Sequence, residues 1–486
     1  MVQHVTIISE LMAKVDKLIS RIDDLEAENR RLEDKVQKLN KNSRNSSKPP
    51  SSDIVKPKKK KEQNNATNDK ETKRKQGGQP GHPKHTRPFY TDEQINKFYN
   101  YFHSSCPDCG GDITPRFDVE HRRIQQLEIK EMPVIKTEHR SYAVWCPACQ
   151  KYHYKPFPRN VIKEGFFQER ITTLVAHLKY VCHCSFSTIR KHIRDVLGET
   201  ISRGYLRKVL EKVSTSLDTS YEELLKRLPL ETIVNADETG HKDKGDKFWT
   251  WLFRTDLYVL FKIDKTRSTQ VLIDVLGESF NGVLGCDYYS SYRCYMRRFD
   301  VVVQFCIAHL IRDVRFLTNL PEQENKDYGN RILNGIREMF KIIHNRASFS
   351  KASFRTALEQ AKKIIIEAAI THVPSLLDKK GKELYTHAKN MAHRFELHGE
   401  SYFTFITTPN ADPTNNIAEQ AVRFVVIDRH ITQGTRGEAG RKTAERLWTV
   451  IGTCQLQGRS AFNFIQEAVH AYFHDQPSPS LLSSPT

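Results

Sequence analysis

The sequence predicts a multidomain α+β protein. An N-terminal coiled coil, a zinc-ribbon-like module and a helical region precede an α/β core, which an all-helical insertion interrupts. Three observations lead to this prediction: leucines recur at seven-residue spacing near the N-terminus, two Cys-x-x-Cys pairs follow, and two short β-branched runs then end in carboxylates. The 486 residues suffice for several domains, and 38% hydrophobic residues suffice for their cores.

The charge balance predicts a polyanionic partner. The chain carries 76 Lys plus Arg against 58 Asp plus Glu, a formal net charge of +18, which favours nucleic acid through phosphate contact and counterion release. No apolar run approaches the roughly 20 residues of a membrane helix, and the N-terminus lacks a signal-peptide pattern. We therefore expect a cytoplasmic, nucleoid-associated protein without a membrane partner.

Residues 1–40 carry a heptad pattern. The a positions are Ile8, Val15, Ile22, Asn29 and Val36, and the d positions are Leu11, Leu18, Leu25, Leu32 and Leu39. β-branched residues at a with leucine at d favour a parallel two-stranded coiled coil, in which a lone Asn at an a position sets the register. The alternative is an amphipathic helix packed on its own domain. We expect a homodimer or higher oligomer through this segment.

Residues 41–88 are rich in Asn, Ser, Pro, Gly and Lys, with few apolar side chains. Such a basic segment cannot bury enough surface to fold alone, so we expect a disordered linker. It would either touch DNA phosphates or remain a solvated linker. We also expect a disordered tail at residues 475–486.

Residues 89–160 contain the two cysteine pairs, Cys106 with Cys109 and Cys146 with Cys149, and alternating patterns lie between them. Four thiolates satisfy tetrahedral zinc, so the pattern predicts one structural Zn²⁺ in a ribbon-like module. Reduced cysteines that only pack are the alternative.

Residues 161–228 show a helical pattern. One helix ends near Gly198 and the next begins at a cap near Ser202, which is typical of a helix-turn-helix. A plain helical hairpin remains the alternative. The second helix would present three basic side chains to DNA: Arg203, Arg207 and Lys208.

Residues 229–306 are predicted to form the first part of the core. The run 231–240 ends at Asp237 and Glu238, two further apolar stretches and a helix follow, and the run 282–287 ends at Asp287. This order, β-β-β-α-β, is typical of a ribonuclease-H-like fold with its first and fourth strands side by side. Asp237 and Asp287 would then meet, and strand alternation would turn Glu238 to the opposite face.

The helical pattern of residues 307–408 predicts an inserted subdomain, after which residues 409–474 complete the core and add C-terminal helices. Glu419 lies just inside a predicted helix start. Its spacing from Asn416 also fits a helix-capping pair. The insertion begins at Cys306-Ile-Ala-His309, which could form half of a metal site but lacks a visible partner pair, so a packing or DNA-contact role is favoured.

Asp237, Asp287 and Glu419 together could hold two divalent metals. Such a pair, about 3.5 to 4 Å apart, stabilises the attacking and leaving oxygens of a phosphodiester. The pattern therefore predicts an enzyme that cuts and joins DNA. Basic residues after Glu419 would form a phosphate track beside the acids, with Arg423 and Arg429 as DNA contacts.

The ordered motifs resemble the transposases of the bacterial insertion sequence family sixty-six over nearly the whole chain. The shared motifs are Asn42-Ser-Arg-Asn-Ser-Ser-Lys-Pro-Pro-Ser-Ser-Asp53, Gly77-Gly-Gln-Pro-Gly-His82, the two Cys-x-x-Cys pairs, Ala236-Asp-Glu-Thr-Gly240, Asp287-Tyr-Tyr-Ser-Ser-Tyr292, Cys306-Ile-Ala-His309, Thr414-Asn-Asn-Ile-Ala-Glu419 and Gly437-Glu-Ala-Gly440. One departure is Tyr288-Tyr289, where the family often has a small residue and then an aromatic one. We expect this to change the pocket wall and not the chemistry.

The resemblance implies a DDE triad of Asp237, Asp287 and Glu419 that holds two Mg²⁺ ions, with Mn²⁺ as an alternative. It implies strand cleavage and transfer at the terminal inverted repeats of an element and in target DNA, with small accessory proteins of the same element as further partners. The alternative function is a catalytically inactive, zinc-containing DNA-binding regulator derived from such an enzyme.

Overall fold

The structure, a computed structural model, describes residues 133–375 and 386–482, together with parts of segments 12–36 and 89–126. The chain divides into two units, one comprising Lys58–Glu138 and the other Met1–Pro57 with His139–Thr486. Within the described part of the smaller unit, a short 3₁₀ turn spans Asp92–Gln94. None of the helices that the structure describes is both long and apolar enough to span a lipid bilayer.

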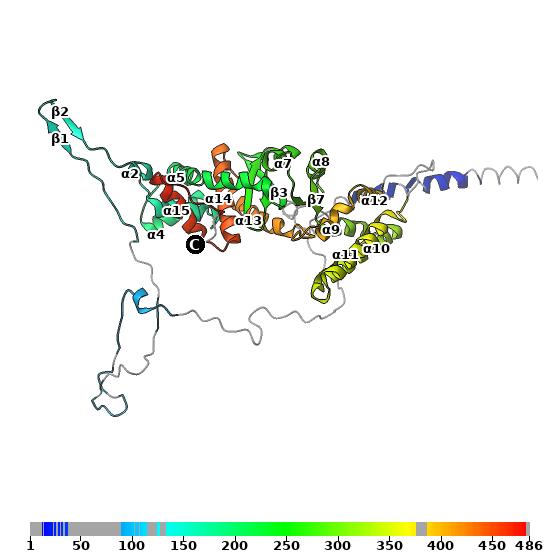
Figure 1. Cartoon of the computed structure of the whole chain (residues 1–486), viewed down its shortest axis with the longest axis horizontal. Helices are drawn as coiled ribbons and strands as arrows, with labels where there is room; N and C mark the ends of the chain where they lie inside the picture. Colours follow the sequence, from blue (N-terminus) through cyan, green and yellow to red (C-terminus); the bar gives the residue numbers. More distant parts are fainter. Residues whose placement is uncertain are drawn as a thin grey trace, which may run out of the picture. The chain divides into compact units, whose positions relative to one another are not determined.

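The described elements of the larger unit, from residue 139 onward, are labelled in Figure 1. The strands are β1 (Ala143–Cys146), β2 (Lys151–Tyr154), β3 (Ile233–Asp243), β4 (Asp246–Arg254), β5 (Val259–Asp264), β6 (Val283–Cys286) and β7 (Val302–Phe305). The helices before the insertion are α2 (Arg159–Glu164), α3 (Glu169–Tyr180), α4 (Phe186–Leu197), α5 (Arg203–Ser216), α6 (Asp218–Arg227), α7 (Thr269–Leu276) and α8 (Ser290–Phe299). The later helices are α9 (Ile307–Thr318), α10 (Gln323–His344), α11 (Lys351–Ile370), α12 (His387–His398), α13 (Asn416–Thr432), α14 (Glu438–Leu456) and α15 (Ala461–Phe473).

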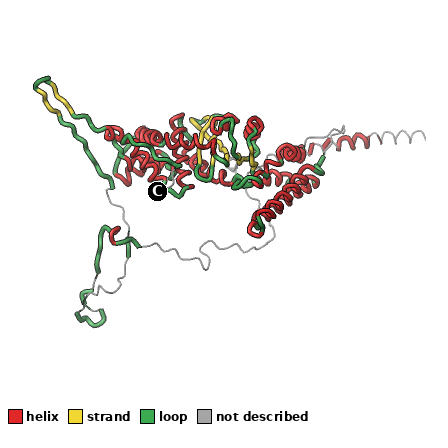
Figure 2. Tube along the Cα trace, in the orientation of Figure 1, coloured by secondary structure: helices red, strands yellow, loops and turns green. Residues whose placement is uncertain are grey.

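The larger of the two described sheets has five strands in the order β5-β4-β3-β6-β7. Strands β3, β4 and β5 pair antiparallel, whereas β6 pairs parallel with β3 and β7 pairs parallel with β6. The expected pairing of the first and fourth core strands is therefore present. The sequence prediction did not include β7, because a four-residue strand that contains a glutamine is too short to show a clear periodicity. Figure 2 shows this sheet in yellow among red helices.

Helix α14 covers the outer edge of β5. Three of its side chains accept hydrogen bonds from alternate β5 amides: Thr453 from Val259 at 3.2 Å, Thr449 from Phe261 at 3.0 Å, and Glu445 from Ile263. Four residues of a helix rise about 6 Å, and two residues of a strand span about 6.8 Å. Side chains four residues apart on α14 are therefore spaced closely enough to reach every second residue of β5. The edge is thereby closed to pairing with another chain.

The helical region before the sheet follows the predicted caps. Helix α4 ends at Gly198, whose φ of 70° is the left-handed conformation that glycine adopts without a steric penalty. The Ser202 hydroxyl caps α5 by accepting from the Tyr205 amide at 3.1 Å. Helix α15, from the C-terminal end of the fold, packs against both α3 and α5, so this region is a bundle of helices from distant parts of the chain.

Helices α9 to α12 form the insertion between β7 and α13. Helix α10 packs along α9 and α11, and the Tyr328 hydroxyl donates to the Ala369 carbonyl at 2.6 Å. The insertion is tied to the sheet by β7, where the Gln304 side chain donates to the Tyr402 carbonyl at 2.9 Å and accepts from the Phe405 amide at 2.8 Å. The insertion therefore has a defined position relative to the strand ends.

Candidate functional site

The parallel register of β3 and β6 brings two acids together. Asn235 pairs with Gly285, so Asp237 and Asp287 each lie two residues beyond paired positions on neighbouring strands, which run about 4.8 Å apart. Asp237 Oδ1 accepts from the Glu238 amide at 2.9 Å, and Asp287 Oδ1 accepts from the Tyr289 amide at 2.8 Å. Backbone groups thus orient both carboxylates.

Asn415 fixes the start of α13 next to these strands. Its side-chain amide accepts from Asn235 Nδ2 at 2.9 Å and donates to the Ala236 carbonyl at 2.8 Å. Its backbone amide donates to Cys306 Sγ at 3.1 Å. Since Asn415 is held by both β3 and the β7–α9 junction, Glu419, in the first turn of α13, lies near the end of the β3–β6 pairing.

Glu419 does not cap its helix. The N-cap of α13 is Asn415, which makes no side-chain capping bond, and the Glu419 carboxylate instead reaches α9. Its Oε1 accepts from the Arg312 guanidinium at 2.8 Å and lies 3.3 Å from His309 Nδ1. The capping alternative is therefore wrong, because the carboxylate is committed to a tertiary contact.

The neighbouring acids perturb Asp237 and Asp287. Burial raises the pKa of Asp237 well above its ordinary value, and the negative charges of Glu238, Asp287 and Glu419 raise it further. Burial and the charge of Glu238 raise the pKa of Asp287 to about 7, although the Tyr289 amide and two arginines oppose this shift. A bound cation would stabilise the ionised form of these closely spaced carboxylates.

Glu238 is buried beside the other acids. Its carboxylate accepts hydrogen bonds from the Arg267 guanidinium and from the Tyr292 hydroxyl. Its charge nevertheless contributes to the raised pKa of both Asp237 and Asp287. The expectation that strand alternation separates Glu238 from the shared site is therefore too simple, because a side chain on the other face remains electrostatically close.

Tyr288 and Tyr289 hold arginines at the edge of the acidic site. The Arg267 guanidinium lies 3.4 Å from the centroid of the Tyr289 ring, and the Arg394 guanidinium lies 3.8 Å from that of Tyr288. Both arginines lower the pKa of Asp287 from where burial alone would put it. Cation–π contacts with the two tyrosines thus hold positive charge next to the carboxylates.

Several residues near Glu419 were not assigned to the site from the sequence. Ligand atoms of Cys306, His309 and Glu419 lie within 4.8 Å of one another, so Glu419 is the neighbour that the Cys306–His309 pair lacked in the sequence. Burial and the charge of Arg312 lower the pKa of His309 to about 4. The three-residue spacing of Cys306, His309 and Arg312 in the sequence indicates that they share one helix face. It did not show that this face contacts Glu419.

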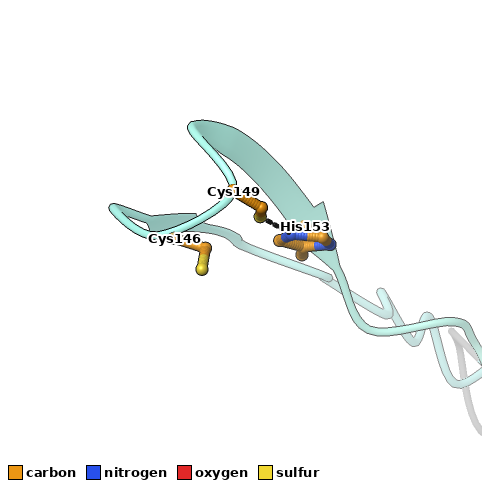
Figure 3. A group of neighbouring side chains, drawn as sticks. All are labelled: Cys146, Cys149 and His153. Carbon is orange, nitrogen blue, oxygen red and sulfur yellow. Dashed lines mark hydrogen bonds between the residues drawn. The ribbon is translucent and has the colours of Figure 1, made fainter.

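A second cluster lies on the β1–β2 hairpin (Figure 3). Cys146, Cys149 and His153 have ligand atoms within 4.8 Å of one another, and Cys149 Sγ lies 3.1 Å from His153 Nε2. Hydrogen bonds from the Cys149 backbone, the Cys149 thiol and the Ala148 backbone lower the pKa of the Cys146 thiol, which favours the thiolate that metals bind. These sulfur and imidazole donors fit zinc. His153 was not predicted as part of the cluster.

The other two predicted zinc ligands belong to the smaller unit. Cys106 lies outside the described residues. Cys109 is exposed and belongs to the smaller unit. The four-cysteine set therefore stays a prediction.

The predicted DNA contacts differ in exposure. Arg203, Arg207 and Lys208 are exposed on α5, where Arg203 donates to Ser187 Oγ at 2.6 Å and Arg207 lies 3.2 Å from Glu211. On α13, Arg423 is exposed, whereas Arg429 is half-buried and donates to Thr239 Oγ1 at 3.2 Å. Arg429 thus has a partner within the fold.

Comparison with known proteins identifies the family. Residues 164–443, more than half of the chain, match the family described as "Transposase IS66 family". The chain belongs to the IS66 transposase family. Residues 103–150 match the zinc-finger binding domain of IS66 transposases, and residues 2–88 match a family of unknown function. The IS66 chain is thus a mixed α/β protein with a zinc-finger domain and a transposase domain.

This IS66 family member also resembles a curated bacterial protein. The uncharacterized protein y4qI of Sinorhizobium fredii is 22% identical over 337 residues, which cover 64% of this chain and 61% of the relative. The chain therefore spans less than two thirds of the length of that relative. The match to the transposase family includes Asp237, Asp287 and Glu419, and the match to the zinc-finger domain includes all four predicted zinc cysteines.

Proposed function

We propose that this protein is a DDE transposase that binds the ends of an insertion sequence and catalyses metal-dependent DNA cleavage and strand transfer. The observation that supports the proposal is that Asp237 in β3, Asp287 directly after β6 and Glu419 in α13 lie near one another, close enough for the charges of the other two to raise the pKa of Asp237. The strand order and the inserted helices support a ribonuclease-H-like core.

Mg²⁺ fits the acidic cluster, because its preferred ligands are hard carboxylate oxygens and the carboxylates are crowded enough for Asp287 and Glu419 to raise the pKa of Asp237. Asp237, Asp287 and Glu419 would hold two Mg²⁺ ions. When bound, such a pair stabilises the attacking and leaving oxygens of an in-line displacement at phosphorus. Mn²⁺ would serve as a substitute.

The chain's own residues orient the site. Amides of Glu238 and Tyr289 hold Asp237 and Asp287, while Arg312 holds Glu419. Arg267, at Tyr289, supplies positive charge at the edge of the acids, where a DNA phosphate would approach, whereas Arg394, at Tyr288, is buried and paired with Asp313. The attraction of Arg267 for phosphate offsets part of the repulsion between the carboxylates and the DNA backbone.

The remaining parts would bring DNA to this site. In our proposal α4 and α5 form a helix-turn-helix in which Arg203, Arg207 and Lys208 face the terminal repeat, and Arg423 with Arg429 lies along the phosphate track. Residues 1–40 form a coiled coil that pairs two chains, and Cys106, Cys109, Cys146 and Cys149 hold one Zn²⁺. Small accessory proteins of the same element are further candidate partners.

The test uses a supercoiled plasmid that carries the inverted repeats flanking the gene. We expect nicking at the repeats in Mg²⁺ and none in EDTA. Asp237→Asn, Asp287→Asn and Glu419→Gln should each lower the nicking rate by at least roughly 10² to 10³-fold while end binding survives, because a charge is lost at nearly constant shape.

The matched control is Asp274→Asn, the same change at an exposed acid on α7, which should nick like wild type. If the three site variants nicked like the control, the assignment of the acids would be wrong. If wild type bound the repeats but never nicked them in Mg²⁺ or Mn²⁺, the regulator alternative would replace the transposase.

A further inference from the structure

A cluster of metal-binding side chains lies outside both sites described above. Glu169 belongs to the first turn of α3, His470 to the last turn of α15, and His474 follows α15 directly. His470 Nδ1 lies 2.8 Å and His474 Nε2 lies 3.0 Å from the same Glu169 oxygen, Oε1. All three ligand atoms lie within 4.8 Å of one another.

The local structure explains this convergence. Four-residue spacing puts His470 and His474 on one helical face, and their ring centroids are 4.4 Å apart. Helix α15 packs against α3, where the Arg170 guanidinium lies 5.6 Å from the centroid of the Phe462 ring. The histidine pair is thus a property of the sequence, whereas the carboxylate is brought to it by helix packing.

We propose that Glu169, His470 and His474 bind a divalent transition metal ion of the Zn²⁺ class. Zinc binds imidazole nitrogen and carboxylate oxygen at about 2.0 to 2.2 Å, so adjacent ligand atoms of a tetrahedral site lie roughly 3.3 to 3.5 Å apart. The observed separations of 2.8 and 3.0 Å need widening by only a few tenths of an ångström. Two imidazoles favour Zn²⁺, Ni²⁺ or Cu²⁺ over Mg²⁺ or Ca²⁺.

The site is open to an ion from solvent. The side chains of Glu169, His474 and His470 are 24%, 32% and 47% exposed. Glu169 and His470 also line a shallow depression of about 430 Å³ with Asn463, Gln466 and Glu467. Three protein ligands leave a fourth position for water or for Glu467, which is one turn before His470.

Metal at this site would connect α15 to α3, which lies in the same helical region as α4 and α5. Because Glu169 lies 301 and 305 residues from the two histidines in the chain, the unfolded protein would bind the ion far less well, and binding would stabilise the fold by mass action. The ion would therefore act as a clasp between α3 and α15. This role is separate from the catalytic carboxylates and from the zinc-finger cysteines.

The test counts zinc in the full-length protein. Total zinc per chain at saturation is the metal present after purification plus the metal taken up in a Zn²⁺ titration. Wild type should hold one Zn²⁺ more than the His470→Ala/His474→Ala double variant. Each single variant should bind this ion at least roughly tenfold more weakly, since losing even an outer partner of a ligand weakens metal affinity 10- to 100-fold. His393→Ala is the matched control, because His393 is an exposed histidine with a glutamate partner, Glu396, at 3.3 Å.

An independent measurement uses Cu²⁺ bound to wild type, whose electron paramagnetic resonance spectrum should show coupling to two nitrogens. This measurement still decides the matter if the double variant does not fold. Equal zinc counts for wild type and a folded double variant would overturn the proposal, and so would a Cu²⁺ spectrum without nitrogen coupling.

Discussion

At Gly285 the absence of a side chain decides how Glu419 is positioned. A Cβ built there would lie 2.3 Å from Asn235 Nδ2, closer than any real contact. Asn235 uses this space to donate to Asn415, and Asn415 anchors the helix that carries Glu419. A glycine in β6 therefore controls the placement of an acid that lies far away in the sequence.

Gly285→Ala is expected to lower stability by about 1 to 3 kcal/mol, the usual range for overpacking, and to lower nicking as well. Urea unfolding and the plasmid assay measure the two effects. Adding Asn235→Ala should restore much of the stability, because the clash is removed, but not the nicking, because Asn415 has lost its partner. Gly440→Ala, in helix α14, where the nearest atom would be 3.7 Å away, is the control and should lower neither. Full nicking by Gly285→Ala would contradict this account.

Glu445 predicts a pH dependence of stability. Burial raises its pKa from 4.5 to about 7 in the folded protein, although the carboxylate accepts from the Ile263 amide. A raised folded-state pKa means that the stabilisation by the protonated form is fully present below about pH 4.5 and is lost as pH rises through about 7. The loss amounts to at most about 3 kcal/mol.

Glu445→Gln keeps an acceptor for the Ile263 amide but cannot ionise. We expect the variant to match wild type in urea unfolding at about pH 4 and to be more stable at about pH 8. Glu438→Gln, at an exposed glutamate of the same helix, is the control. The same pH dependence in Glu445→Gln and wild type would show that this carboxyl is not the group responsible.

Among the elements, the β1–β2 hairpin has little packing of its own. It has only four residues in each strand, and the described apolar side chains on it, such as Val144, Trp145 and Tyr152, are exposed. A two-stranded hairpin of this kind is marginal in water without further support. Metal at Cys146 and Cys149 supplies that support in our proposal.

Cys146→Ser is expected to lower bound zinc by one ion per chain and to unfold the zinc-finger domain. His153→Ala should retain the ion but bind it about 10- to 100-fold more weakly, because in the four-cysteine set His153 acts as an outer partner of the Cys149 thiolate. Competition with a zinc chelator measures both. Loss of the ion in His153→Ala, with binding intact in Cys106→Ser, would make His153 a ligand in place of Cys106.

At the scale of the whole molecule, the apolar seam near the N-terminus predicts association. In the described part of segment 12–36, helical residues such as Leu18, Ile22 and Leu25 are 54 to 62% exposed. A single chain gains little from an exposed leucine row, whereas a second copy would bury it.

Deleting residues 1–40 is therefore expected to shift the protein from dimer towards monomer in sedimentation. Leu18→Lys, at a d position, should weaken association, and Lys17→Ala, on the outer face of the same heptad, should not. An unchanged mass after the deletion would rule out the coiled coil as the dimer contact.

Residues that act locally could be read from the sequence. Gly198 and Ser202 end and begin helices because a left-handed glycine and a capping hydroxyl depend on their immediate neighbours. The pairing of β3 with β6 was also predictable, because the order of strands and helices restricts which strands can be neighbours. The position of Asp287 directly after β6 followed from the same pattern, whereas β3 continues past Asp237 to Asp243, so the expectation that this strand stops at its acids was wrong.

Contacts between distant segments were decided by the tertiary structure alone. The sequence could not distinguish a Glu419 that caps its helix from one that binds Arg312, because the local spacing is the same in the two cases. Only the position of α13 beside β3 and α9 shows that Glu419 binds Arg312. Likewise, the four-residue spacing of His470 and His474 is visible in the sequence, but Glu169 joins them only where α3 meets α15. Local sequence determines which groups a helix or strand presents, and burial of the common core determines which groups meet.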